Sequence, residues 1–216
     1  MTTSTAAFEM AIVHRAFRTE LHRLPELTSR VRAGDAERAA VVNAHLNLIV
    51  AVLHHHHAAE DDLIWPKLHA RVPMRDDDIS RMEAEHHAIA AAAATATATA
   101  TVWAETGAPA WAEQLCAAVD ELIRLVDRHL DHEEHDIVPL IAEFITASEW
   151  KKATARGASF LRTHPRMGLV IAGFMLDGVS ADDKHRFLAG VPSTARLMWR
   201  LLGTRTYQRY RAKLYG

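Results

Sequence analysis

The chain carries the pattern H-x3-E-x5-P twice, as His56, Glu60 and Pro66 and again as His129, Glu133 and Pro139. A His and a Glu four residues apart lie on one face of an α-helix, separated by about 6 Å along its axis. Two such helices that face each other bring two imidazoles and two carboxylates together. The repeat therefore predicts a site for a pair of metal ions between the helices of a bundle.

Four long helical segments are predicted, over residues 5–31, 35–68, 76–105 and 110–145. In each segment apolar residues recur at steps of three and four, which is typical of a helix with one face in a core. Together they predict an all-α, up-down-up-down four-helix bundle over residues 1–146. The Ala/Thr-rich stretch 90–101 is predicted to be helical, although its alternation also resembles a strand. Residues 147–216 are predicted to form a smaller helical extension after the bundle. Within it, Thr146 to Glu149 and Ser180 to Asp183 resemble helix starts.

Each predicted core stripe contains a histidine, and two stripes also contain a glutamate. Counted from the connecting turns, the four histidines stand about 19 or 20 residues away, so helix rise places them in one layer of the bundle. A buried carboxylate without a partner costs several kcal/mol, so these glutamates need a cation or a donor nearby. The predicted metal ligands are His14, His56, Glu60, His86, His129 and Glu133.

Two of these positions have a competing neighbour. On the third helix His87 could bind in place of His86, and on the fourth Glu134 could replace Glu133. Five further histidines are expected to be exposed or to lie just outside the ligands, namely His54, His55, His57, His132 and His135. Asp61 and Glu134 are expected to orient the ligands. A polar network without a metal is the alternative interpretation.

The motifs resemble those of hemerythrin-like, HHE cation-binding proteins over roughly residues 8–145. The matching stretches are HRAF, HHHHAAEDDLIWP, MEAEHHAI and HLDHEEHDIVPL. The resemblance implies a four-helix bundle with a non-heme di-iron centre, two Fe ions with an oxo or hydroxo bridge. Members of that family handle O2, sense oxygen or iron, or react with NO or peroxide, and related bacterial proteins are linked to stress responses.

The chain departs from the oxygen-carrier pattern at two points. Carriers have two histidines four apart on the third helix, whereas here Met82 precedes His86 by four residues and Ala90 follows it by four. The carrier carboxylate on the fourth helix follows its histidine by five residues, whereas Glu133 follows His129 by four. These differences predict a site with fewer imidazoles, which favours redox reactivity or sensing over reversible O2 carriage.

The predicted function is therefore to bind, sense or react with O2, peroxide or NO, with consumption of peroxide or NO as the candidate enzymatic activity. Two alternatives remain at this level. One is an iron-storage or signalling module without turnover, and the other is a structural zinc-binding bundle. Zn or Mn would suit the same imidazole and carboxylate ligands as Fe.

Charge divides the chain unevenly. Residues 147–216 hold 13 Lys/Arg and 4 Asp/Glu, a net +9, whereas residues 1–146 hold 12 and 23, a net −11. The basic extension is expected to pack on the bundle or on a second copy in a homodimer; contact of its aromatic and basic last helix with nucleic acid or a membrane is the less favoured alternative. The single Cys116, and the lack of a recognisable secretory signal or membrane-spanning run, predict a cytoplasmic protein.

Overall fold

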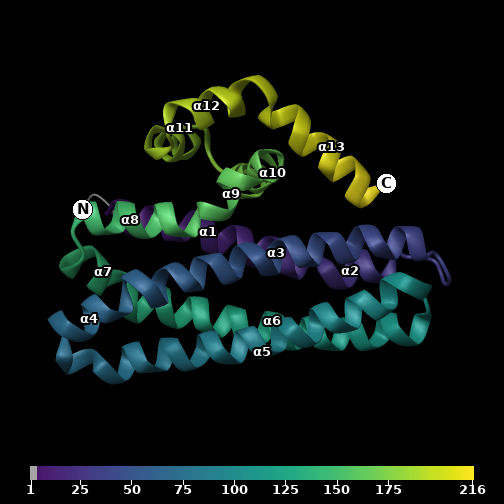
Figure 1. The fold of residues 1–216 in the computed structure, drawn as a ribbon, viewed down its shortest axis with the longest axis horizontal. Coiled ribbons are helices and arrows are strands. Elements are labelled where there is room, and N and C mark those ends of the chain that lie inside the picture. Colours follow the sequence, from purple (N-terminus) through teal and green to yellow (C-terminus); the bar gives the residue numbers. More distant parts are fainter. Residues whose placement is uncertain (1–3) are drawn as a thin grey trace. The chain divides into compact units, whose positions relative to one another are not determined.

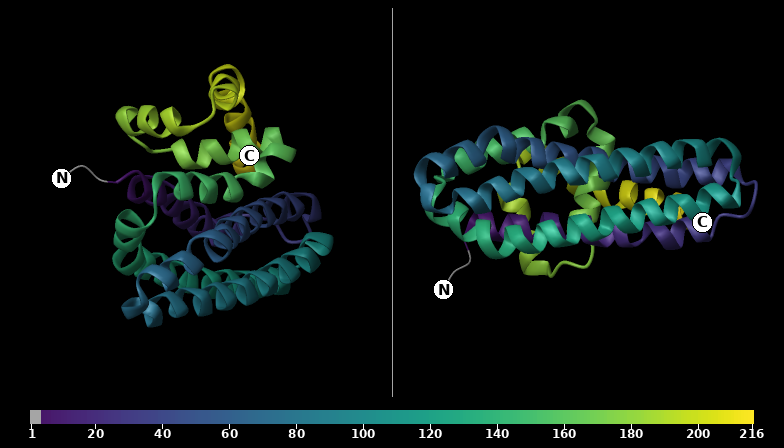
Figure 2. Two further views of the ribbon diagram at one scale, coloured as in Figure 1. Left: turned by 60° about the vertical axis from the view of Figure 1, so that its left-hand side comes forward. Right: turned by 90° about the horizontal axis from the view of Figure 1, so that it is seen from below.

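The structure, a computed structural model, describes residues 4–216, with backbone only at 162 and 163, and all its regular elements are helical. Up to residue 144 the elements are α1 (Thr5–His22), α2 (Leu24–Ser29), α3 (Ala36–Leu63), α4 (Trp65–Arg71), the 3-10 turn η1 (Pro73–Arg75), α5 (Asp76–Thr106), α6 (Pro109–His132), the π-helical turn η2 (Glu133–Ile137) and α7 (Val138–Phe144). Figure 1 shows α1, α3, α5 and α6 running side by side, and Figure 2 shows the same bundle from two further directions. The predicted all-α four-helix bundle is confirmed.

Local sequence signals explain where these helices begin and end. The Asp35 carboxylate accepts the backbone N–H of Arg38 at 2.9 Å and so caps the start of α3. The Ala/Thr stretch lies within α5, as predicted, because alanine has the highest helix propensity. Its threonine hydroxyls bond to carbonyls one turn earlier, such as Thr97 to Ala93 at 2.9 Å. Gly107 ends α5 in the left-handed region, at φ 61°.

Gly107 is expected to be the bundle glycine that tolerates substitution least. A Cβ added there would lie 2.7 Å from the backbone N of Asp35, and φ is positive as well. Gly107→Ala should therefore lower the free energy of unfolding by about 2 kcal/mol or more. Gly34 is the matched control, because its φ is 80° but no atom lies within 4 Å of an added Cβ, so Gly34→Ala should cost only about 1 kcal/mol. Equal losses in urea unfolding would contradict this account.

The helix α8 (Ala147–Gly157) packs against α3 and so belongs with the bundle. Thr146 and Glu149 form the predicted capping box at its start. Glu149 also pairs with Arg71 at 2.7 Å, and at the other end Arg156 pairs with Asp62 at 2.8 Å. These contacts attach α8 along the outer side of the helix that carries the first H-x3-E-x5-P repeat.

The chain divides into two compact units, up to Ala158 and from Ser159 onwards. The division falls one helix later than the predicted boundary between residues 146 and 147, because α8 packs on the bundle. The second unit contains α9 (Ser159–Thr163), α10 (Pro165–Leu176), α11 (Ala181–Gly190), α12 (Ser193–Met198), the π-helical turn η3 (Trp199–Gly203) and α13 (Thr204–Tyr215). Its predicted cap is present, since the Ser180 hydroxyl accepts the Asp183 N–H.

One helical segment, 36–71, is long and apolar enough to cross a membrane if length and composition alone are considered. This segment is α3 with α4, and its buried side chains include His45, His57 and Glu60. They contact other bundle helices, for example through the stacked rings of His57 and His86. Core helices of bundles pass the same test, so the finding carries no conclusion about a membrane.

Candidate metal centre

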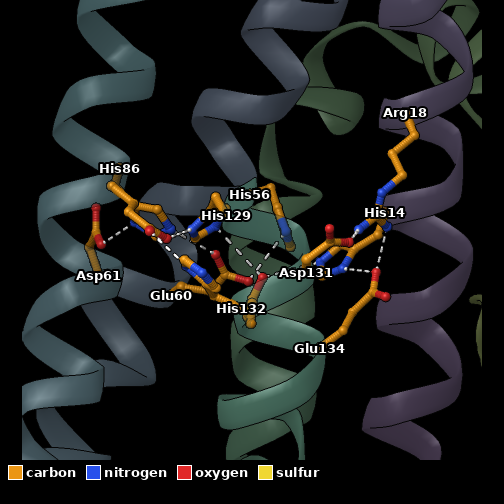
Figure 3. A network of polar contacts seen from close by, with 12 residues as sticks. His14, Arg18, His56, Glu60, Asp61, His86, His129, Asp131, His132 and Glu134 are labelled. Atoms are coloured by element: carbon orange, nitrogen blue, oxygen red, sulfur yellow. Dashed lines mark hydrogen bonds and ion pairs between the residues drawn. The ribbon is translucent and has the colours of Figure 1, made fainter. Parts of the chain in front are cut away.

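Polar side chains from all four bundle helices meet in one buried layer (Figure 3). The helix α3 contributes three of them, α1 and α5 contribute one each, and α6 with the following turn η2 contributes two, because each stands on the core stripe of its own helix. The residues are His14 on α1, His56, His57 and Glu60 on α3, His86 on α5, His129 on α6 and Glu133 at the start of η2, and all are buried except the half-buried His56.

Two groups of possible ligand atoms lie in this layer. His14, His56 and Glu133 form one group and His57, His86 and His129 form the other, and within each group the ligand atoms lie within 4.8 Å of one another. In the second group the rings of His57 and His86 are stacked, with centroids 3.9 Å apart. Each group is compact enough to hold a metal ion.

Two carboxylates lie between the groups and reach both. The Oε1 atom of Glu60 lies 3.3 Å from Nε2 of His56, whereas its Oε2 lies 3.7 Å from Nε2 of His86. The Oε2 atom of Glu133 lies 3.3 Å from Nε2 of His14 and 3.7 Å from Nε2 of His129. Both glutamates are thus placed to bridge a pair of cations.

The atoms that point into the layer have no hydrogen-bonding partner of normal geometry among the described residues, although they are buried. They are Nε2 of His14, His56, His57, His86 and His129, Oε2 of Glu60 and both carboxylate oxygens of Glu133. Buried polar atoms are normally hydrogen-bonded, and leaving so many unpaired in one place is costly. Imidazole nitrogens and carboxylate oxygens are also the ligands that Fe, Mn and Zn prefer, so the residues present fit a bound metal pair.

The outward-facing nitrogens of three histidines are held by carboxylates. Nδ1 of His14 lies 2.9 Å from Glu134, and Nδ1 of His86 lies 2.7 Å from Asp61. Nδ1 of His129 lies 3.2 Å from Oε2 of Glu85. A carboxylate accepts, so Nδ1 carries the proton and Nε2 keeps its lone pair toward the layer.

Glu85 and Arg18 extend these contacts to the surface. Glu85 also accepts from His132 at 2.8 Å, and Arg18 donates to Glu134 at 2.6 Å (Figure 3). The expected orienting contacts of Asp61 and Glu134 are thus present. The involvement of Glu85 was not predicted, because its spacing from His86 gives no sign that it points toward α6.

The prolines of the two repeats explain a distortion beside each glutamate. A proline cannot donate to the carbonyl four residues back and its ring crowds that carbonyl. Before Pro66 the helix breaks at Ile64, and before Pro139 it widens into the π-helical turn Glu133–Ile137. Such turns are frequent at functional sites. Here the wider turn places Glu133 and Glu134 at Nε2 and Nδ1 of the same ring, His14.

Burial and mutual charge set the protonation of the metal-free site. Burial lowers the pKa of His56 to about 3, and it lowers the pKa of His57 well below its ordinary value. Burial, with the charge of Glu133, raises the pKa of Glu60 well above its ordinary value. Burial alone would raise the pKa of Glu133, but His14 outweighs it and the pKa is lowered. At neutral pH the metal-free site therefore contains neutral imidazoles at His56 and His57 and a Glu60 carboxyl group that resists ionisation.

The metal-free protein should lose stability as pH rises above about 7. A group whose pKa is raised by folding binds more protons in the folded state, so stability falls with pH until that pKa is passed. Glu60 is such a group, because its pKa is raised by folding. His14 is another: burial lowers its pKa, but Glu133 and Glu134 outweigh burial and the pKa is raised. Above about pH 7, His56 and His57 are neutral in both states and contribute nothing.

Urea unfolding of chelator-treated protein at several pH values measures this slope. Glu60→Gln is the control variant, because the amide has nearly the same shape and does not titrate. It should remove much of the decline. A wild-type slope no steeper than that of Glu60→Gln would contradict the account.

The structure brings all six residues predicted as ligands into this layer. Two predicted ligands had a competing neighbour. On α5, His86 is buried and His87 is exposed. In the turn η2, Glu133 is buried, whereas Glu134 accepts from Nδ1 of His14 on the side away from the layer. Metal binding by these residues stays a prediction.

His57 lies closer to the predicted ligands than expected. It was expected to be exposed or to lie just outside the ligands, yet it is buried and its ring stacks on His86. The signal that could have found it is its spacing from Glu60, since residues three apart on a helix also share a face. The layer therefore contains five imidazoles. Whether all five bind a metal stays a prediction, so the expected shortage of imidazole ligands, and the preference for reactivity over O2 carriage that rested on it, are not supported by the composition of the layer.

Fold and site define a helical bundle whose buried His/Glu clusters could hold metal ions. A family model described as the hemerythrin HHE cation binding domain matches residues 6–141. The chain belongs to this family. Comparison with curated proteins and with solved structures found no significant match.

Proposed function

We propose that the bundle holds two iron ions and that this pair binds or reacts with O2, peroxide or NO. One observation carries the proposal: buried imidazole and carboxylate atoms without hydrogen-bonding partners converge from four helices. One ion would be held by His14, His56 and Glu133 and the other by His57, His86 and His129, with Glu60 and Glu133 reaching both groups. Iron is favoured by the family resemblance, whereas the ligand types alone also suit Mn and Zn.

The side chains prepare the layer for divalent cations. His56 and His57 are kept neutral by burial, so they need not lose a proton before they bind a metal. Asp61, Glu85 and Glu134 hold the Nδ1 protons of three other rings and thereby fix which nitrogen faces the ion. The two central glutamates supply negative charge where the cations would repel each other.

Apolar residues surround the layer and limit the access of water. They include Phe17, Leu53, Ile89 and Val126, which are all buried. A dry surrounding strengthens electrostatic interactions and influences the redox potential of a bound metal. When bound, a pair of iron ions supplies redox equivalents and open positions for a small ligand.

The test uses protein loaded anaerobically with ferrous iron and freed of excess metal. Visible absorption is recorded while O2, hydrogen peroxide or NO is added in stoichiometric amounts. At least one of them should change the spectrum at about one equivalent per chain, and metal-free protein should show no change. Protein that holds two irons per chain and responds to none of the three would contradict the proposal.

A further inference from the structure

Four large apolar side chains are exposed within six consecutive residues of the second unit. The exposed fractions are 54% for Leu197, 39% for Met198, 68% for Leu201 and 53% for Leu202. Among the described residues only Met74 and Val102 are comparable exposed hydrophobics, and they stand apart. We call residues 197, 198, 201 and 202 the apolar patch; a cluster of this kind marks a contact surface more often than chance.

The opposite side of the same helical segment is occupied by its own unit. Tyr207 donates to Asp177 at 2.9 Å, and Arg211 donates to the same carboxylate at 2.7 Å. Phe174 of α10 packs edge-to-face on Tyr207. These contacts fix the rotation of α13 about its axis, and within this unit they leave the apolar patch uncovered.

A row of basic side chains continues from the apolar patch. Arg205, Arg209 and Lys213 follow Leu197 and Leu201 at the same four-residue spacing, and all five are exposed. Residues 184–216 contain eight Lys/Arg and no Asp/Glu. The surface thus combines apolar side chains with positive charge and has no acidic residue in its own segment to neutralise that charge.

We propose that this face of α12, η3 and α13 docks on an anionic lipid surface. Apolar side chains can enter the boundary between headgroups and acyl chains while the adjacent arginines and lysine pair with lipid phosphates. Nucleic acid would satisfy the charges but leave the leucines and Met198 without a partner. A second copy joined through the same face would bring like charges together.

The test is cosedimentation of the full chain with vesicles of phosphatidylcholine alone or mixed with phosphatidylglycerol. Wild-type protein should sediment with the anionic vesicles only, and less so as salt is raised. The double variant Leu201→Gln/Leu202→Gln should bind about tenfold more weakly or worse. Met74→Gln is the matched control, since Met74 is 95% exposed in the bundle unit, and it should bind like wild type.

Charge is tested in parallel with Arg205→Gln/Arg209→Gln, which should also weaken binding. Lys151→Gln/Lys152→Gln removes the same charge from exposed positions of α8 and should not. Circular dichroism checks that each variant is folded. Failure of wild type to bind, or equal binding by wild type and the Leu201/Leu202 variant, would overturn the proposal. So would a dimer, or binding to DNA, that accounts for the face in the absence of vesicle binding.

Discussion

Replacing His57 by alanine is expected to reduce the metal content by about one ion per chain. The His57 ring is one of three imidazoles in its group, stacks on His86 and is buried. Its removal would leave two imidazoles, with only the shared carboxylates of Glu60 and Glu133 within reach, to hold an ion that three imidazoles would otherwise hold. Metal bound after extensive dialysis is measured by plasma mass spectrometry.

His87→Ala is the matched control for this experiment. His87 directly follows His86 in the chain, but it is exposed. The control should keep the wild-type metal content. If His57→Ala also keeps it, His57 orients its neighbours and the two-group description of the site is wrong.

Glu133→Gln is expected to have a larger effect, the loss of most of both ions. The carboxylate is fully buried and its Oε2 faces His14 in one group and His129 in the other. The amide is neutral and keeps only one acceptor oxygen, so neither cation is neutralised as before. Apparent metal affinity should fall by about a hundredfold or more, which competition with a chelator measures.

Folding is not expected to explain this loss. The glutamine has nearly the same volume, and its amide can donate to the carboxyl oxygen of Glu60, so the metal-free variant should unfold at a urea concentration no lower than that of metal-free wild type. Glu143→Gln, an exposed substitution in α7, serves as the control and should keep both ions. Unchanged metal content in Glu133→Gln would refute the bridging role.

Much of the bundle could be predicted from sequence because its core stripes are regular over long helices. Steps of three and four residues identified the helices, and the turn signals at Asp35 and Gly107 fixed two of their ends. The position of the site followed from the same regularity, since helix rise alone sets the height of His14 or His129 in the layer. These are local properties, and the structure agrees with them.

Other features depend on contacts between helices and could not be predicted. His57 and His56 both lie within one turn of Glu60, and only the position of α5 decides that His57 meets His86. Glu85 was missed for the same reason, because its partner His129 lies on α6. In the oxygen-carrier pattern a second histidine stands on the third helix, where this chain has Met82. Here the α3 residue His57 brings an imidazole to the same group instead.

The second unit was the least predictable part. Its short helices give no long periodic signal, and the helix of Met198 and Trp199 was expected to bury its apolar side chains against the bundle or a second copy. The structure leaves Met198 and its leucine neighbours exposed within their own unit. The vesicle experiment tests whether these side chains contact lipid. Packing of the extension on the bundle stays a prediction.

The central claim is most directly tested by counting metal ions per chain in untagged protein from iron-replete cells, with plasma mass spectrometry and amino-acid analysis. The account predicts close to two irons. A content near two that is mainly zinc would favour a structural bundle over a redox site. Protein that binds no metal, before or after incubation with ferrous iron, would contradict the claim that the buried histidines and glutamates hold a metal pair.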